Sequence, residues 1–138
     1  SRLMHTEKKD EEIWQLLLVV FQRLNYKLLT TDYKLLLYYF LWNFFVLLGY
    51  SPELYACPIC AKKLLPETFF LSPQHGGVVC WGCRDFPAVE ITVEAVKLIR
   101  FFIKEPIEKV ERLNVSEKDL QNLNQALTVY FDFLAEKG

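Results

Sequence analysis

Along most of this chain, apolar residues recur every three or four positions, which is the period of an amphipathic helix. Residues 1–9 are polar and have no period, so we expect a flexible start there. Asp10 is a suitable N-cap, and the two glutamates that follow it favour the first turn of a helix. We expect this helix to extend to about Leu24.

The second predicted helix contains the most apolar stretch of the chain, residues 35–48. Thr31 or Asp32 is its expected N-cap, and Gly49 is suited to the left-handed position that ends a helix. The stretch has fourteen residues and includes Asn43, whereas a membrane-spanning helix needs about 20 apolar residues. We therefore expect a helix surrounded by protein, with association of this stretch with a membrane as the alternative.

Helical periodicity returns after Pro87. Thr92 is the expected cap of a helix that continues to about Lys104. A short turn follows Pro106, and Ser116 is expected to cap the last helix. The apolar positions predicted for these two helices are Val96, Ile99 and Ile103 in the first and Leu120, Leu123, Leu127, Phe131 and Leu134 in the second.

The middle of the chain has a different pattern. Residues 68–71 and 77–79 are short β-favouring runs separated by a loop, and together they predict a β-hairpin. We place this hairpin in an insert at residues 55–86, between the second and third predicted helices. Residues 10–138 are thus expected to form a single, mainly α domain, a bundle of about four main helices with an inserted ribbon.

All four cysteines of the chain lie in this insert, as Cys57-Pro58-Ile59-Cys60 and Cys80-Trp81-Gly82-Cys83. Nineteen residues separate the two Cys-x-x-Cys pairs, which is a spacing typical of a four-thiolate zinc site. Zinc bound by four cysteines is tetrahedral and keeps no open position. The pattern therefore predicts one structural Zn²⁺, which cannot activate water. Its expected ligands are Cys57, Cys60, Cys80 and Cys83. With the apolar stretch at residues 35–48, the alternative function is that of a membrane-associated zinc-ribbon protein.

Three other interpretations of the four cysteines remain. Disulfides usually replace a missing core in small secreted domains, but 52% of this chain is hydrophobic, which is ample core material. A thioredoxin-like redox pair needs one Cys-x-x-Cys within a βαβ pattern, and the sequence has no such pattern. Iron fits the same four ligands as zinc, so ligand type alone does not separate the two metals.

Length and net charge narrow the set of possible functions. A chain of 138 residues has the usual size of one domain, and its formal net charge is −1. Four thiolates and one Zn²⁺ would change that charge to about −3. This balance is not typical of a domain that binds nucleic acid by its overall positive charge.

Catalytic patterns are scarce in this sequence. His5 and His75 are its only histidines, and neither has a sequence neighbour that suggests a nucleophile and base. The only Gly-Gly pair, Gly76-Gly77, lies in the hairpin and not in a phosphate-binding loop. We therefore predict a protein that is not an enzyme.

Two groups of cations are candidates for partner binding. Lys97, Arg100 and Lys104 follow each other at positions i, i+3 and i+7, so they share one face of their predicted helix. Such a stripe can bind phosphates or an acidic peptide, or it can simply be solvated. The second group lies just after the cysteine pairs and consists of Lys62, Lys63 and Arg84.

One ordered set of motifs resembles a known family. Leu47-Leu48-Gly49-Tyr50-Ser51-Pro52-Glu53-Leu54 leads directly into the first cysteine pair, and Phe70-Leu71-Ser72-Pro73 and Gly76-Gly77-Val78-Val79 precede the second. With the two closing helices, this order resembles the C-terminal domain of the bacterial recombination mediator family RecO. The resemblance covers residues 10–136 approximately.

The resemblance implies a mostly helical domain with a zinc-binding insert, in a bacterial cytoplasmic protein of recombinational DNA repair. The family anneals strands and helps to load RecA, with RecR and the C-terminal tail of single-stranded-DNA-binding protein as partners. It contacts DNA mainly through an N-terminal OB fold, which these 138 residues do not contain. The tail is acidic and ends in a hydrophobic residue, so the expected receptor is an apolar pocket bordered by Lys97, Arg100 and Lys104.

Overall fold

The computed structural model describes residues 12, 15–16, 23, 33–85 and 88–137. Most of the helix predicted to end near Leu24, like the polar start, lies outside these residues. The described part is mainly α with one small antiparallel sheet, so the predicted fold class is confirmed. Its elements are α2 (Tyr33–Leu47), β1 (Phe69–Ser72), β2 (Gly77–Val79), β3 (Val89–Ile91), α3 (Val93–Lys104), α4 (Ile107–Val110) and α5 (Glu117–Lys137).

The chain forms two compact units, and each is built from two separate segments. The first unit consists of Ser1–Ser51 and Phe102–Leu113, and the second of Pro52–Phe101 and Asn114–Gly138. The first therefore contains α2, α4 and the last residues of α3. The second contains the sheet, all four cysteines, most of α3 and the whole of α5.

In the first unit, α2 ends at the predicted glycine. Gly49 has a left-handed backbone with a φ of 92°. Its amide donates to the carbonyl oxygen of Val46 at 3.0 Å, and the amide of Tyr50 donates to that of Phe45 at 2.8 Å. These two bonds form a Schellman motif, which satisfies carbonyls that the end of a helix leaves without partners.

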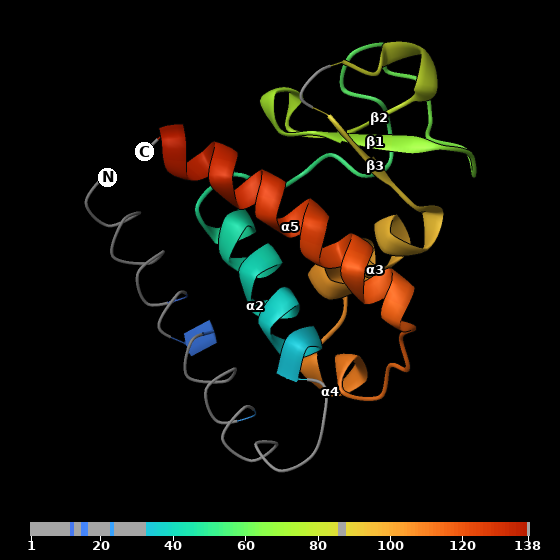
Figure 1. Ribbon diagram of the computed structural model, residues 1–138. Coiled ribbons are helices and arrows are strands. Elements are labelled where there is room, and N and C mark those ends of the chain that lie inside the picture. The colour runs from blue at the N-terminus through green and yellow to red at the C-terminus, as the bar shows by residue number, and fades with distance from the viewer. Residues whose placement is uncertain (1–11, 13–14, 17–22, 24–32, 86–87, 138) are drawn as a thin grey trace. The chain divides into compact units, whose positions relative to one another are not determined.

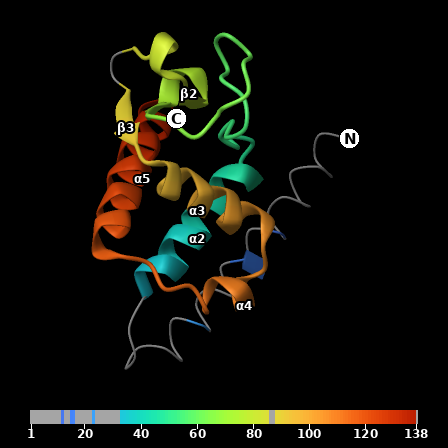
Figure 2. The ribbon, with the colours of Figure 1, turned by 90° about the vertical axis from the view of Figure 1, so that its right-hand side faces the viewer.

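In the first unit, one buried apolar contact joins α2 to α4. Leu36 and Ile107 form a buried cluster where α4 lies beside α2 (Figure 2). Asn43 is satisfied there, because its side-chain amide donates to the carbonyl oxygens of Tyr39 at 2.8 Å and Phe102 at 2.9 Å. Neither α2 nor any other described helix has the length and hydropathy of a membrane span.

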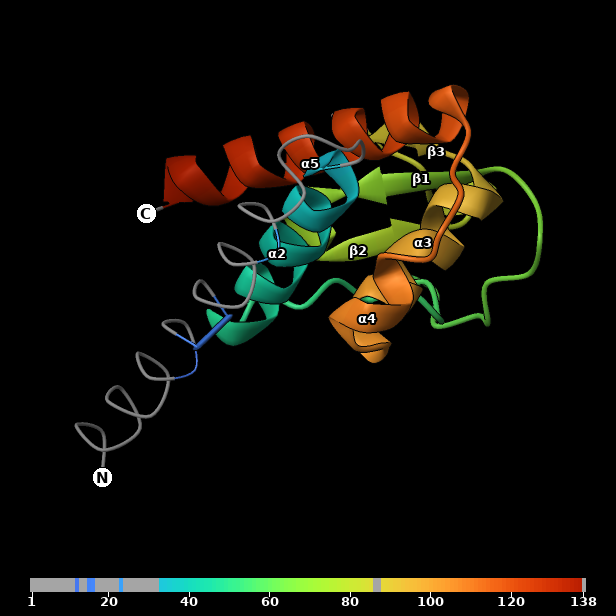
Figure 3. The same cartoon turned by 90° about the horizontal axis from the view of Figure 1, so that it is seen from below.

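The sheet of the second unit has three strands in the order β2-β1-β3. The predicted hairpin is present, with Leu71 paired to Val78, and Figure 3 shows its strands β1 and β2 pointing in opposite directions. The prediction missed β3, which pairs antiparallel with the other edge of β1 and places Phe70 opposite Glu90. β3 has only three residues, too few for an alternating pattern to stand out in the sequence.

The last helix, α5, packs on β3 in the same unit (Figure 1). Ser116 caps it as predicted, since its hydroxyl accepts from the amide of Asp119 at 3.2 Å. The cap of α3 is also confirmed, with the hydroxyl of Thr92 accepting from the amide of Ala95 at 3.1 Å. The largest fully buried side chains of this unit include Leu71, Val78, Val79, Ile91, Val96, Ile99 and Leu123.

One of the apolar positions named for α5 lies at the surface and not in the core. Phe131 is 45% exposed, whereas its neighbour Tyr130 is only 2% exposed and belongs to the core. At 100° per residue, Tyr130 lies closer than Phe131 to the centre of the face that also carries Leu123 and Ala126. A smaller correction concerns α3, where Ile103 is only partly buried and Phe102 is fully buried.

Candidate metal centre and cation-bordered pocket

The first cysteine pair lies in a tight turn, residues 57–60, which we term the first knuckle. The amide of Cys57 donates to the carbonyl oxygen of Lys62 at 2.8 Å, and the amide of Ala61 donates to that of Cys57 at 2.8 Å. Ala61 has a left-handed backbone with a φ of 66°, which is uncommon for a residue with a Cβ. The turn thereby reverses the chain directly after the second sulfur ligand.

The second pair lies in the second knuckle, residues 80–83. Cys80 directly follows β2, and Trp81–Cys83 form a single 3-10 turn. The amide of Cys83 donates to the carbonyl oxygen of Cys80 at 3.1 Å, and the amide of Arg84 donates to that of Trp81 at 3.3 Å. The sheet therefore positions the second knuckle through the end of one strand.

The two knuckles bring the four sulfur atoms together. The Sγ atoms of Cys57, Cys60, Cys80 and Cys83 all lie within 4.8 Å of one another. Those of Cys60 and Cys80 are 3.8 Å apart, far beyond the roughly 2.05 Å of a disulfide bond. A regular tetrahedron with Zn–S distances of about 2.3 Å has sulfur–sulfur distances of about 3.8 Å. The cluster thus has the dimensions of a four-thiolate metal site, and all four cysteines are free of disulfides.

The shifted pKa values of two of the thiols, Cys57 and Cys83, also fit a site for a cation. Burial raises the pKa of the Cys57 thiol, but hydrogen bonds from the backbone of Cys60, Cys80 and Ile59 lower it to about 6. The pKa of Cys83 is raised to about 12, chiefly by the hydrogen bond with the Cys80 side chain. Adjacent thiolates repel each other, so they cannot all ionise unless a cation lies among them. A soft divalent ion removes this repulsion and binds the thiolate form of each ligand.

Backbone contacts connect the segment before the first knuckle with the strand before the second. The amide of Glu53 donates to the carbonyl oxygen of Gly76, and the amide of Val78 donates to that of Glu53, both at 2.8 Å. A Cβ on Gly77 would come within 2.3 Å of the carbonyl oxygen of Glu53, so only glycine fits at this crossing. The two halves of the cysteine cluster are therefore held in register by the backbone as well as by any ion.

The three cations of the predicted stripe have different surroundings. Arg100 is partly buried and donates from Nε to the carbonyl oxygen of Leu54 at 3.1 Å and also from Nη2. Its guanidinium carbon lies 4.5 Å from the ring centroid of Tyr55. Lys97 and Lys104 are exposed. Arg100 thus has a structural role that helical periodicity alone did not reveal.

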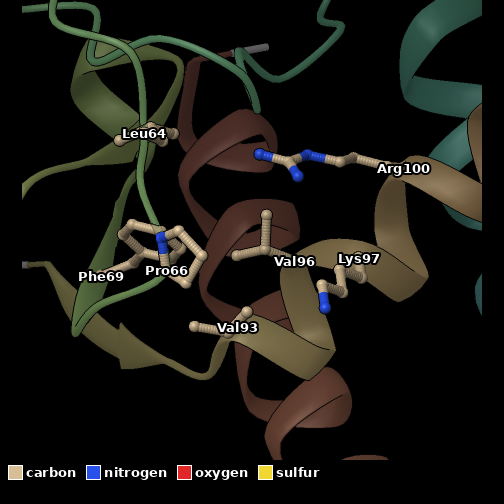
Figure 4. Close-up of a pocket in the computed structure, with 7 residues that line it drawn as sticks. All are labelled: Leu64, Pro66, Phe69, Val93, Val96, Lys97 and Arg100. Atoms are coloured by element: carbon tan, nitrogen blue, oxygen red, sulfur yellow. The ribbon is translucent and has the colours of Figure 1, made fainter.

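A small apolar pocket borders two of these cations (Figure 4). Its apolar lining comes from α3, from the first residue of β1 and from the segment that leads into this strand. Lys97 and Arg100 complete the lining, with their charged groups on either side of Val96 in the close-up. The cavity measures about 40 Å³, well below the roughly 150 Å³ that accommodates benzene. We term it the cation-bordered pocket, and its residues are Leu64, Pro66, Phe69, Val93, Val96, Lys97 and Arg100.

The structure also gives His75 neighbours that the sequence did not suggest. Its Nδ1 lies 2.9 Å from the hydroxyl oxygen of Ser72 and 3.3 Å from a carboxylate oxygen of Asp85. A Ser-His-Asp triad instead uses opposite ring nitrogens for the serine and the carboxylate. The group therefore lacks the proton path of a triad, and the side chain of Gln74 also occupies the carboxylate of Asp85.

Trp81 is an exposed aromatic residue of the second knuckle that the sequence pattern failed to single out. It is 52% exposed although it lies inside the second Cys-x-x-Cys. In the sequence it is one of two spacer residues between cysteines, and the only available signal was the size of its side chain. Large apolar side chains at the tip of a metal-binding turn cannot be buried by so short a segment.

A family profile and several known proteins resemble this chain, and they agree on one family. The profile of the family described as "Recombination protein O C terminal" matches residues 1–138. A protein of Dehalococcoides mccartyi named DNA repair protein RecO is 34% identical over 132 residues, which cover 95% of this chain and 51% of that protein. A protein of the same name from Caldicellulosiruptor saccharolyticus is 29% identical over 132 residues, which cover 95% of this chain and 52% of the relative.

A third relative with that name, from Syntrophomonas wolfei, is 36% identical over 95 residues, which cover 67% of this chain and 37% of the relative. The chain thus spans about half the length of the relatives that match it most fully. No solved structure shows a significant match. The family profile covers the whole chain, and the cysteine knuckles and closing helices occur in the expected order. The chain therefore belongs to the RecO family, to whose C-terminal part it corresponds.

Proposed function

We propose that this chain is a non-enzymatic interaction domain of a RecO-type mediator of recombinational DNA repair, acting in the bacterial cytoplasm. The observation that carries the proposal is the match of the C-terminal family profile to residues 1–138. The relatives are named DNA repair proteins, which supports a repair role for the whole protein. Strand annealing and RecA loading would be activities of the whole protein together with its partners.

One structural Zn²⁺ is the second part of the proposal, with residues 55–86 as the zinc-binding insert. The sulfur–sulfur distance of 3.8 Å and the four thiol ligands support it. Iron would accept the same ligands, so the metal is tested by elemental analysis of the purified protein. We expect one zinc per chain and four thiols that become reactive only after chelation. Iron in equal amount, or four oxidised cysteines, would contradict zinc as the resident metal.

Two features of the site support a role without enzymatic activity. Four protein ligands leave a metal no position for water or substrate. The contacts of Ser72 and Asp85 converge on one nitrogen of His75, which does not activate a nucleophile. Both features support a domain whose role is to bind partners.

We assign the tail of single-stranded-DNA-binding protein to the cation-bordered pocket and include a RecR-like protein as a further partner. An acidic tail with a hydrophobic end needs a cation beside an apolar cavity, and this pocket offers both. Arg100 is engaged by Leu54, so Lys97 is the cation that we expect to contact the tail carboxylate. An aromatic end group needs more room than the present cavity provides, so binding should move the lining side chains.

Titration with a tail peptide tests this assignment. We expect Lys97→Glu to weaken binding about tenfold, roughly 1.4 kcal/mol, since it reverses the charge beside the pocket. Lys118→Glu is the matched control, because Lys118 is also exposed and helical but does not line the pocket. Equal affinity of the two variants at low salt would show that Lys97 is only solvated, while the family assignment would remain.

A further inference from the structure

The four cysteines of the metal centre differ in their access to solvent. Cys60 is exposed, and so are the residues before and after it. Cys57 lies three residues earlier in the same turn and is only 1% exposed. Cys80 and Cys83 are partly buried. A small solute therefore reaches the cluster at Cys60 and not at Cys57.

Cys60 also lies beside a sulfur atom of the other knuckle. Its Sγ is 3.8 Å from that of Cys80. A disulfide bond measures about 2.05 Å, so the two sulfur atoms need to approach by roughly 1.8 Å to be joined. Cys57 is less free to move, because its sulfur is hydrogen-bonded by the backbone of Cys60, Cys80 and Ile59. Cys80 is thus the better placed partner for Cys60.

Backbone hydrogen bonds hold the two knuckles side by side. The amide of Glu53 donates to the carbonyl oxygen of Gly76, and the amide of Val78 donates to that of Glu53. Both bonds join peptide groups, so neither depends on a thiolate or on an ion. All the residues of this crossing and of both knuckles belong to the same compact unit. We therefore expect the sulfur atoms of the two knuckles to stay close when an ion leaves.

From this arrangement we propose that Cys60 and Cys80 form a reversible disulfide when the cluster has lost its ion and meets a hydroperoxide. The proposal rests on the metal site proposed above. While an ion is bound, each thiolate serves as a ligand and is masked from other reactions. After its loss, the disulfide joins the same two knuckles that the ion had joined. Cys60 is thus a modification site, and the bound ion protects it.

The reaction consumes one hydroperoxide for each disulfide. The thiolate of Cys60 attacks a peroxide oxygen, so that a sulfur–oxygen bond forms, the oxygen–oxygen bond breaks and the leaving oxygen takes up a proton. The thiolate of Cys80 then attacks the sulfur of this sulfenic acid, and the hydroxide that leaves is protonated to water. The two thiols lose two electrons, and the hydroperoxide gains them as it becomes an alcohol and water. A thiol reductant reverses the disulfide.

The disulfide also controls the uptake of metal. With Cys60 and Cys80 joined, only Cys57 and Cys83 are left as thiol ligands, too few for a tetrahedral four-thiolate site. Metal can therefore return only after reduction. Because the disulfide links the two knuckles, we expect the oxidised domain to remain folded and to reload zinc once it is reduced.

The test treats the 138-residue chain with hydrogen peroxide in two forms, loaded with zinc and after chelation. Disulfides are located by mass spectrometry of proteolytic peptides. We expect the chelated chain to lose about two thiols and to yield mainly the Cys60–Cys80 peptide pair. The loaded chain should react at least about tenfold more slowly. Equal rates would overturn the protective role of the ion, and a main product that joins two cysteines of one knuckle would overturn the pairing.

Elemental analysis before the treatment separates this proposal from the metal assignment. A chain that neither carries nor takes up a metal would contradict the zinc site, and with it the protective role of the ion. The pairing of Cys60 with Cys80 is then decided by the same peptide map. Addition of a thiol reductant and zinc to the oxidised chain should restore one zinc per chain, and failure to do so would contradict a reversible disulfide.

Two serine variants identify the thiol that is attacked. Cys60→Ser and Cys57→Ser are matched, since each leaves three cysteines, two of them in the second knuckle. After chelation, Cys57→Ser should still form the Cys60–Cys80 disulfide, whereas Cys60→Ser should react with hydrogen peroxide at least about tenfold more slowly. Equal rates would contradict the proposal. Unfolding curves show whether each variant folds. If Cys60→Ser does not, a limiting amount of peroxide on the chelated parent decides, because Cys60 should be modified first and initial modification of Cys57 would overturn the proposal.

Discussion

The Cα of Gly77 lies so close to the backbone of Glu53 that a Cβ at this position would be 2.3 Å from the Glu53 carbonyl oxygen and 2.7 Å from its nitrogen. Backbone atoms cannot move aside as the end of a flexible side chain can. The same crossing carries the hydrogen bonds of Glu53 to Gly76 and Val78. A single small residue therefore permits the contact that brings the two knuckles into register.

Gly77→Ala tests this contact. We expect it to lower the free energy of unfolding by about 2 kcal/mol or more, because the strand and the segment before the first knuckle must separate. Gly82→Ala is the control, since a Cβ on Gly82 would meet nothing within 4 Å. Urea unfolding and metal content are measured for both variants. Equal stability of the two would show that the crossing adapts to a methyl group without cost.

Asn122 on α5 holds the junction between β3 and α3. Its Oδ1 accepts from the amide of Thr92 at 2.9 Å and lies 3.2 Å from the Thr92 hydroxyl, and its Nδ2 donates to the carbonyl oxygen of Glu90 at 3.2 Å. Asn122→Ala should cost about 1–3 kcal/mol, because it removes the acceptor of the partly buried Thr92 amide and the donor to the exposed Glu90 carbonyl oxygen. Gln125→Ala, an exposed change on the same helix, should stay within about 0.5 kcal/mol. A similar loss in both variants would contradict a specific role for Asn122.

The contrast between these contacts and the caps shows which features a sequence reveals. Gly49, Thr92 and Ser116 were predicted correctly because a cap depends on a residue and the few that follow it. The bond from Asn122 to Thr92 joins residues thirty positions apart, and β3 exists because it pairs with β1. Partners so distant in sequence leave no local pattern.

The candidate sites show the same difference between local patterns, which a sequence reveals, and contacts between distant residues, which it does not. The Cys-x-x-Cys spacing carries its own geometry, so the clustering of the four cysteines was predictable. Helical spacing correctly placed Lys97 and Arg100 on one helix, but it could not show that Arg100 is engaged by Leu54, forty-six residues earlier. Nor could it show that Phe70 and Arg84 would hold Trp81 at the surface.

The buried phenol of Tyr130 should make the folded state less stable at alkaline pH. Burial raises its pKa from the usual 10 to about 12. Between these values the unfolded chain loses the phenol proton while the folded chain keeps it, so rising pH favours unfolding. The stabilising contribution of the protonated Tyr130 phenol is fully present below pH 10. It is lost as the pH rises to about 12, by at most about 1.4 kcal/mol per pH unit.

Tyr130→Phe isolates this effect, because phenylalanine does not ionise. We expect the difference in unfolding free energy between the parent and this variant to shift against the parent by about 2–3 kcal/mol across that interval. Denaturant unfolding at several alkaline pH values measures it. A constant difference would show that the phenol of Tyr130 ionises equally in both states.

Measurements of stability and of peptide binding on the same variants should show that Arg100 and Lys97 have different roles. Arg100 donates from Nε and Nη2 to the carbonyl oxygen of Leu54 and stacks on Tyr55, and a lysine cannot reproduce this planar, two-nitrogen contact. Arg100→Lys should therefore lower the free energy of unfolding by about 1–2 kcal/mol while keeping the charge beside the pocket. Lys97→Gln should leave stability within about 0.5 kcal/mol, because its side chain is exposed.

Peptide affinity should show the reverse order. Arg100→Lys keeps a cation at the cation-bordered pocket, so its affinity for the acidic tail should stay within about threefold of the parent. Lys97→Gln removes the exposed cation and should weaken the tail more than Arg100→Lys does. Unfolding curves and peptide titrations on the same protein samples distinguish the two roles. If Arg100→Lys were fully stable yet failed to bind the tail, Arg100 would be a direct ligand of the carboxylate, and its contact with Leu54 would be replaceable at little cost.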